Sequence, residues 1–172
     1  HGVANHLIQV LETAAIIKEQ HPDVLFVFIG SGMQKMDLIK SKEELKLDNV
    51  LFLDPVPKKE IFKYILASDF GMSVLKKVDT FRTIYSNKTF DYMACKKPLF
   101  LLIDGVSRKL VEDAKCGIYV EPENPKAFVD AIVRFKDSKI ESKEMGLNGY
   151  NYAKLNFDRN VLANEYIALI SK

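Results

Sequence analysis

A loop and the helix after it, residues 81–98, hold the side chains best suited to chemistry. The segment reads FRTIYSNKTFDYMACKKP and gathers hydroxyls, an amide, a cation and a carboxylate around one expected helix start. Ser86 or Asn87 can cap this helix, whose free N–H groups and positive dipole end attract an anion. Lys88 adds a mobile positive charge there, and Asp91, one turn later, can accept hydrogen bonds from hydroxyls. A phosphate beside a diol is the middle of a nucleotide, so the segment predicts a site for a phosphorylated ligand.

Strand-length apolar runs alternate with helical patterns on both sides of this loop. We expect strands at residues 24–29, 50–53, 70–75, 99–103 and 118–120, and helices at 7–17, 33–45, from 57, from 86, 107–114, beyond 122 and 159–170. This alternation predicts an α/β fold of the Rossmann-like class, a mainly parallel sheet with helices on both faces. Ligands of such sheets bind beyond the carboxyl ends of the strands, which is where the loop lies.

Length and composition limit the possible classes of protein. The 172 residues, 48% of them hydrophobic, suit a single domain spanning 1–172. A net charge of +2 with dispersed lysines does not indicate a nucleic-acid partner. We find neither a signal sequence nor an apolar window near the ~20 residues of a membrane span, so we expect a domain that is soluble by itself. Because His1-Gly2 leads almost directly into a helical pattern, we expect the N-terminal part of a longer protein to be absent.

Other local patterns carry weaker signals. Gly30-Ser31-Gly32 is half of a dinucleotide-binding loop, but Lys35 stands where the third glycine belongs, so we expect a plain tight turn. Asp54 ends a strand like a phosphorelay acceptor, yet the other residues of such a site are missing. Cys95 and Cys116 predict two buried, reduced thiols in a cytoplasmic protein. We assign no catalytic side chain and no metal ligand, because the histidines are isolated.

The motif after the loop is similar to a family signature. Phe90-Asp91-Tyr92-Met93-Ala94-Cys95, followed by Lys97-Pro98, matches Glu-Tyr-Met-Ala-Cys-Gly-Lys-Pro, with Lys96 at the glycine. The chain thus resembles the C-terminal, donor-binding domain of family 4 retaining glycosyltransferases, GT-B proteins with two Rossmann-like domains across a cleft. Residues 2–7 are similar to the family's loop after the first strand, 28–32 to its Val-Gly-x-Gly turn and 49–52 to the strand before its base-binding loop. The run 81–88 is most similar to a capsule and O-antigen assembly subgroup.

This resemblance implies roles for individual residues. The family uses one glutamate near the donor sugar and a second on the ribose hydroxyls; Thr83 stands in place of the first, and Asp91 keeps the second in shortened form. Ser86 and Asn87 stand where the subgroup has proline and serine, so their backbone amides would meet the diphosphate.

The remaining donor-site residues are implied in the same way. Lys88 and Arg82 are the available cations, Gly2 would belong to a phosphate-facing loop, and Val56 would offer backbone hydrogen bonds to the nucleobase. The family's activating arginine and lysine find no place in this sequence. The final helix, within residues 158–172, would pack on the absent N-terminal domain.

The sequence therefore predicts the donor half of a retaining glycosyltransferase that moves a hexose-type unit from a nucleoside diphosphate sugar to a glycan or lipid-linked acceptor. We expect a role in surface polysaccharide synthesis, no cofactor or metal, no activity in the isolated domain, and contact of the full-length protein with the inner membrane face. Two alternatives stay open. One is a sugar-nucleotide epimerase of the same architecture, although its catalytic carboxylates and histidine are not found. The other is a non-enzymatic α/β interaction domain.

Overall fold

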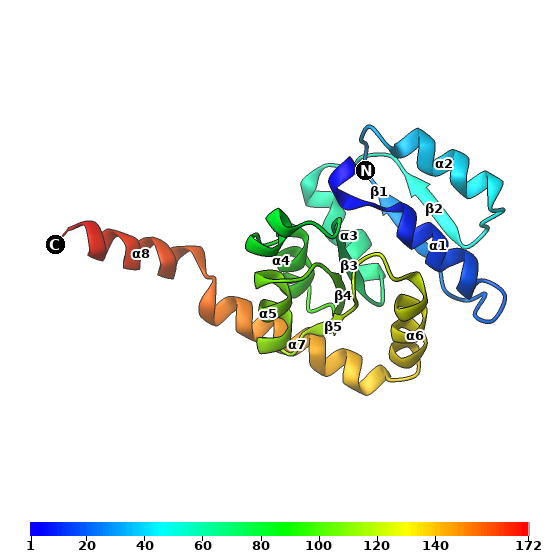
Figure 1. The fold of residues 1–172 in the computed structure, drawn as a ribbon. Helices are drawn as coiled ribbons and strands as arrows, with labels where there is room; N and C mark the ends of the chain where they lie inside the picture. The colour runs from blue at the N-terminus through cyan, green and yellow to red at the C-terminus, as the bar shows by residue number, and fades with distance from the viewer. Residues whose placement is uncertain (172) are drawn as a thin grey trace.

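The computed structural model describes residues 1–171, apart from the side chain of Glu165. Helices and strands alternate along the chain (Figure 1). They are η1 (Val3–Asn5), α1 (Ile8–Ile17), β1 (Phe26–Ile29), α2 (Lys35–Glu44), β2 (Val50–Leu53), α3 (Lys58–Ala67), β3 (Gly71–Val74), η2 (Asp79–Thr83), α4 (Asn87–Ala94), β4 (Leu99–Leu102), α5 (Val106–Asp113), β5 (Gly117–Tyr119), α6 (Pro125–Lys136), α7 (Lys139–Asn156) and α8 (Arg159–Ile170). Every expected strand is present, and its ends lie within two residues of the expected ones.

All strand pairings in the described residues are parallel, which confirms the expected α/β class. They form two sheets, β1–β2 and β3–β4–β5, where we expected one. Residues 1–5 connect the carboxyl ends of both sheets. The carbonyl of His1 accepts a hydrogen bond from the N–H of Gln34, after β1, at 3.1 Å, and that of Ala4 accepts one from Lys76, after β3, at 2.8 Å.

Alternation along β4 divides its side chains between two hydrophobic clusters. Phe100 and Leu102 join the cluster that contains residues of α1, α6, β1 and β2. Leu99 and Leu101 face the opposite way and join the cluster formed with α4 and α5. Helices therefore cover β4 on both faces, as its uninterrupted apolar sequence predicts.

Two expected helix caps differ from the observed ones. Ser107 was expected to cap α5, but the N-cap is Gly105 at φ +83° and the Ser107 hydroxyl donates to the Ile84 carbonyl at 2.7 Å. Ser86 is the N-cap of α4, yet its side chain makes no capping hydrogen bond. A hydroxyl thus predicts a nearby helix start, but tertiary contacts decide which group it bonds.

Three helices end on a lysine in the left-handed conformation. Lys46, Lys96 and Lys115 follow α2, α4 and α5 with φ of 52°, 56° and 47°. The N–H of Lys96 donates to Met93 and that of Lys97 to Tyr92, which is the Schellman pattern; equivalent bonds follow the other two helices. Glycine favours this left-handed position, which explains the glycine of the family signature, and Lys96 adopts the same conformation in its place.

The final helix, α8, projects away from the rest of the chain (Figure 1). Its bounds agree with the expected ones. Leu162, Tyr166, Leu169 and Ile170 expose 43%, 64%, 69% and 66% of their surface. Nothing in the described residues covers these four apolar side chains. Their expected packing on another domain stays a prediction.

Both cysteines are free thiols. Cys116 is buried, and desolvation raises the pKa of its thiol to about 12. Cys95 is half-buried, which corrects the expectation that both are buried, and desolvation also raises its pKa.

Candidate functional site

The start of α4 lies beyond the carboxyl end of β3. Ser86 accepts a hydrogen bond from the N–H of Thr89 at 3.0 Å, while Asn87 and Lys88 occupy the exposed first turn. The Thr89 hydroxyl is buried and lies 3.0 Å from the Ser73 hydroxyl of β3. This buried contact fixes the helix start against the strand, so its N–H groups and positive dipole end are held in place for an anion.

Lys88 reaches from this helix start to the N-terminal segment. Its ammonium donates to the Asn5 side-chain oxygen at 3.0 Å. The side chain as a whole is exposed, but protein atoms crowd the ammonium, and this desolvation lowers its pKa. A bound anion would replace the missing solvation, so Lys88 is suited to phosphate. The carbonyl of Gly2, three residues before Asn5, accepts the N–H of Asn5 at 3.0 Å, and a Cβ at Gly2 would make only an ordinary contact, 3.7 Å, with the Asn5 side-chain nitrogen.

A second cation, Lys35, approaches the same segment from α2. The pKa of the His1 amino group is lowered, first by burial and then by repulsion from the positive charges of Lys88 and Lys35. Both lysines are therefore close enough to affect the same group. Lys35 donates to the Leu53 carbonyl at 3.1 Å and pairs with Asp54 at 3.0 Å, and 17% of its side chain is exposed. Our sequence analysis missed Lys35 as a site residue, although its position just after the Gly30-Ser31-Gly32 turn was an available signal.

Asp91 lies one turn along α4 from Lys88. Its carboxylate is 31% exposed and pairs with the Lys58 ammonium at 3.8 Å. Lys58 begins α3 directly after residues 54–57, which contain the half-buried Val56. The structure therefore brings the expected ribose ligand and the expected base-binding loop to neighbouring positions.

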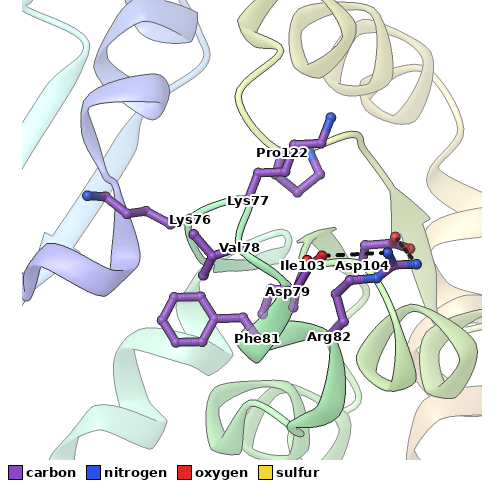
Figure 2. A pocket seen from close by; sticks show the side chains of 9 residues that line it. All are labelled: Lys76, Lys77, Val78, Asp79, Phe81, Arg82, Ile103, Asp104 and Pro122. Carbon is purple, nitrogen blue, oxygen red and sulfur yellow. Dashed lines mark ion pairs between the residues drawn. The ribbon is translucent and has the colours of Figure 1, made fainter.

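Arg82 and Thr83 have different surroundings. The Arg82 guanidinium pairs with Asp104 at 3.3 Å and Asp79 at 3.9 Å, and Figure 2 shows it directed toward Asp104. The exposed Thr83 hydroxyl donates to the Thr80 carbonyl at 3.1 Å. Carboxylates thus already compensate the Arg82 charge, and Lys88 is the less compensated of the two expected cations.

A pocket of 220 Å³ lies beside Arg82 (Figure 2). Its lining combines charges of both signs with apolar surface, and consists of Lys76, Lys77, Val78, Asp79, Phe81, Arg82, Ile103, Asp104 and Pro122.

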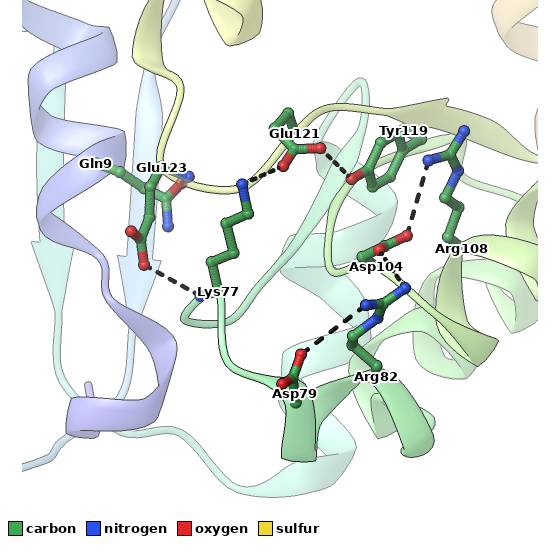
Figure 3. A network of polar contacts seen from close by, with 9 residues as sticks. All are labelled: Gln9, Lys77, Asp79, Arg82, Asp104, Arg108, Tyr119, Glu121 and Glu123. Carbon is green, nitrogen blue, oxygen red and sulfur yellow. Dashed lines mark hydrogen bonds and ion pairs between the residues drawn. The ribbon is translucent and has the colours of Figure 1, made fainter.

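Charged side chains hold the rim of this pocket together (Figure 3). Lys77 pairs with Glu121 at 2.7 Å, and Glu121 accepts the Tyr119 hydroxyl at 2.7 Å. Arg108 lies 4.0 Å from the centre of the Tyr119 ring and pairs with Asp104 at 3.7 Å. Burial first, and then the Glu121 carboxylate, raise the pKa of Tyr119, so its hydroxyl remains a hydrogen-bond donor near neutral pH. The loop between β3 and α4 is therefore tied to the ends of β4 and β5.

The described side chains and helices lack two other kinds of feature. Among the side chains that the structure describes, no group of three or more His, Cys, Asp or Glu residues has an arrangement that could hold a metal ion. Among the helices described, none has the length and apolar character needed to cross a membrane.

A family model agrees with the observed fold. Residues 4–152 match the family described as "Glycosyl transferases group 1", which is most of the chain. The chain therefore belongs to the group 1 glycosyltransferases.

Three known proteins illustrate the similarity. Spore coat protein SA of Bacillus subtilis (strain 168) is 25% identical over 171 residues, which are 95% of this chain and 44% of that protein. The structure of Anabaena Alr3699/HepE in complex with UDP superimposes with a TM-score of 0.84 at 17% identity, covering 97% of this chain and 45% of that one. The C-terminal domain of the Francisella tularensis group 1 protein LpcC gives 0.77 at 18% identity, covering 92% and 84%. The chain thus spans less than half of the curated relative and most of one isolated C-terminal domain.

Proposed function

We propose that this chain is the donor-binding domain of a retaining glycosyltransferase, which transfers a hexose-type unit from a nucleoside diphosphate sugar to a glycan or lipid-linked acceptor in surface polysaccharide synthesis. The observation that carries the proposal is the desolvated Lys88 ammonium beside the start of α4, with Asp91 one turn away. Family membership and the UDP complex of a protein with the same fold support it.

In this proposal, the start of α4 and Lys88 bind the diphosphate. The first-turn amides at Ser86 and Asn87 and the segment containing Gly2 would surround its oxygens, while Lys88 supplies the charge. Negative charge develops on the diphosphate as the glycosidic bond breaks, so donors that are already fixed in place lower the barrier. Thr83 would face the donor sugar. Arg82 would contribute indirectly, by fixing the loop before α4 through its ion pair with Asp104.

Asp91 and Val56 set the orientation of the nucleoside. The Asp91 carboxylate would accept the ribose hydroxyls in exchange for its long contact with Lys58, and the backbone at Val56 would bond the base. Lys35, which the sequence analysis left out, would add positive charge near the sugar-bearing phosphate.

The rest of the reaction needs a second domain. Our proposal includes no general base, metal or cofactor from this chain; acceptor binding and exclusion of water are assigned to a facing N-terminal domain, on which α8 would pack. The full-length protein would work in the cytoplasm at the membrane face. The 172-residue chain should then bind nucleotide but transfer no sugar from UDP-glucose to water or glycan. Measurable transfer by this chain alone would contradict the proposal that a second domain is required.

A nucleotide panel tests the donor site directly. UDP, GDP, TDP, ADP and CMP are titrated against the chain by calorimetry and thermal shift, and repeated with Asp91→Ala. A ligand at 100 times its Kd should stabilise the fold by about 2.7 kcal/mol. We expect one preferred diphosphate and its loss in Asp91→Ala, whereas Asp113→Ala, which removes a carboxylate paired with Lys109 on α5, should bind normally. Equal loss in both variants would remove the support for Asp91.

A further inference from the structure

The turn between β4 and α5, residues 104–107, contacts the loop that leads into α4. We propose that this turn is a positioning element for the start of α4, and that Ser107 is a positioning residue of the nucleotide site without touching the nucleotide. The inference rests on the proposed function for its ligand, but its structural part can be tested without one.

Ser107 makes an unusual contact for a hydroxyl inside a helix. It is 1% exposed and lies in the first turn of α5, where a serine hydroxyl commonly bonds a nearby backbone group. Its hydroxyl instead donates to Ile84, 23 residues earlier in the chain, at 2.7 Å. Ile84 precedes the N-cap Ser86 by two residues, so this bond fixes the backbone immediately before the proposed anion site.

Gly105 brings the two backbones into direct contact. Its φ is +83°, and a Cβ built on it would lie 2.1 Å from the Arg82 carbonyl oxygen. Any side chain at this position would displace the loop. The lack of a side chain at Gly105 therefore allows the close approach of the loop to the turn.

Asp104 adds a third contact, through the Arg82 side chain at 3.3 Å. Arg108, which lies against the Tyr119 ring, pairs with the same carboxylate and orients it (Figure 3). The three contacts thus hold the loop at residues 82 and 84, from one turn.

The loop itself has little burial with which to fix its conformation. Residues 82–85 are all exposed, and the Tyr85 ring, at about 6 Å from Phe90 and Phe157, provides its main apolar packing. Segments with few buried contacts open most easily. The position of the α4 start therefore depends on hydrogen bonds and ion pairs supplied from outside the loop. Among them, the bond from Ser107 has a buried donor and is shielded on that side from competing water.

Comparison of Ser107→Ala with Thr13→Val tests this role. Thr13 is also fully buried, and its hydroxyl donates to the Gln9 carbonyl at 2.7 Å, but within α1. Both variants lose one buried hydroxyl and should lower Tm by similar amounts. Amide hydrogen exchange at residues 84–88, measured without ligand, should accelerate about tenfold more in Ser107→Ala than in Thr13→Val.

Binding of UDP gives the second readout. We expect Ser107→Ala to weaken UDP binding about three- to tenfold, Thr13→Val to leave it unchanged, and Ser107→Thr, which keeps the hydroxyl, to restore both exchange and affinity. Equal exchange at residues 84–88 in the two hydroxyl-deletion variants would overturn the proposal. If the unaltered chain binds no UDP but the exchange difference is present, the positioning role stands and the proposed function fails for that nucleotide.

Discussion

Strand β4 of one sheet and strands β1 and β2 of the other are equally apolar but have different surroundings. All four residues of β4 are at most 1% exposed, whereas Val27 of β1 and Leu51 of β2 expose 38% and 41% of their surface. Both sheets pack one face on the cluster under α1 and α6, but only β3–β4–β5 has a second covered face, formed with α4 and α5. An uninterrupted apolar run thus predicts a strand, and it is typical of strands covered on both faces such as β4, but β1 and β2 have such runs without this covering.

The same difference extends to the proposed site. The fully covered sheet carries Lys88, the start of α4 and the turn that fixes the loop. The other sheet contributes Lys35, whose charge is already compensated by Asp54. Rigid packing therefore lies under the groups to which we assign the diphosphate.

Truncation of core side chains should give the largest difference between the sheets. Phe100→Ala in β4 should lower the free energy of unfolding by about 3–5 kcal/mol, because it leaves a cavity between two packed layers. Val27→Ala in β1 should cost less than about 1 kcal/mol, since its side chain already meets solvent. Urea denaturation measures both, and comparable losses would contradict the proposed difference in covering.

Thiol reactivity examines the second covered face. With a pKa of about 12, only about one Cys116 thiol in ten thousand is ionised at pH 8. Iodoacetamide should therefore modify Cys95 first and Cys116 only on unfolding, as mass spectrometry of the native chain can show. A Cys95→Ser variant isolates Cys116, and its rapid native-state labelling would mean that this face is open.

The raised pKa of the Cys116 thiol also makes the stability of the fold depend on pH. The folded state raises the pKa of Cys116 from 9.0 to about 12, so it favours the neutral thiol. This contribution is fully present below pH 9 and is lost as pH rises from 9 toward 12. Urea midpoints should fall over that interval less steeply in Cys116→Ala than in the unaltered chain.

Substitution of the two lysines compares the contributions of the sheets to ligand binding. Lys88→Ala should weaken binding of the preferred nucleoside diphosphate about 10- to 100-fold, the range for a charge-assisted hydrogen bond. Lys35→Ala should weaken it by less than about fivefold, because Asp54 and the Leu53 carbonyl already bind its ammonium. Calorimetry with both variants decides the order, and a larger loss for Lys35→Ala would reverse our assignment.

The smallest expected change in stability concerns the end of α4, a helix that packs on the fully covered sheet. Lys96→Gly should raise the free energy of unfolding by about 0.5–1 kcal/mol, since glycine adopts a positive φ without strain. The gain is reduced by loss of the Lys96 ammonium from the Tyr150 ring, 4.7 Å away. Lys115→Gly provides a second test after α5, and destabilisation by both substitutions would contradict this account.

Local sequence predicted most elements because their determinants are local. The final helix and the strand at residues 50–53 have the expected bounds, and the sequence located the start of α4. It could not predict the bond from Ser107 to Ile84 or the compensation of Arg82 by Asp104, because these depend on contacts between separate loops. Lys35 differs from these contacts, because its position just after the Gly30-Ser31-Gly32 turn was a sequence signal; what the sequence did not show is its proximity to the His1 amino group.

The hydrophobic cluster under α1 and α6 contains side chains from both sheets. Phe26, Phe28 and Val50 of one sheet share it with Phe100 and Leu102 of the other. Loss of either sheet would expose side chains that the other also buries, so neither has an independent melting transition. Calorimetric and van't Hoff enthalpies should agree, and the chain should unfold cooperatively as one thermodynamic unit even though its backbone ladders are separate.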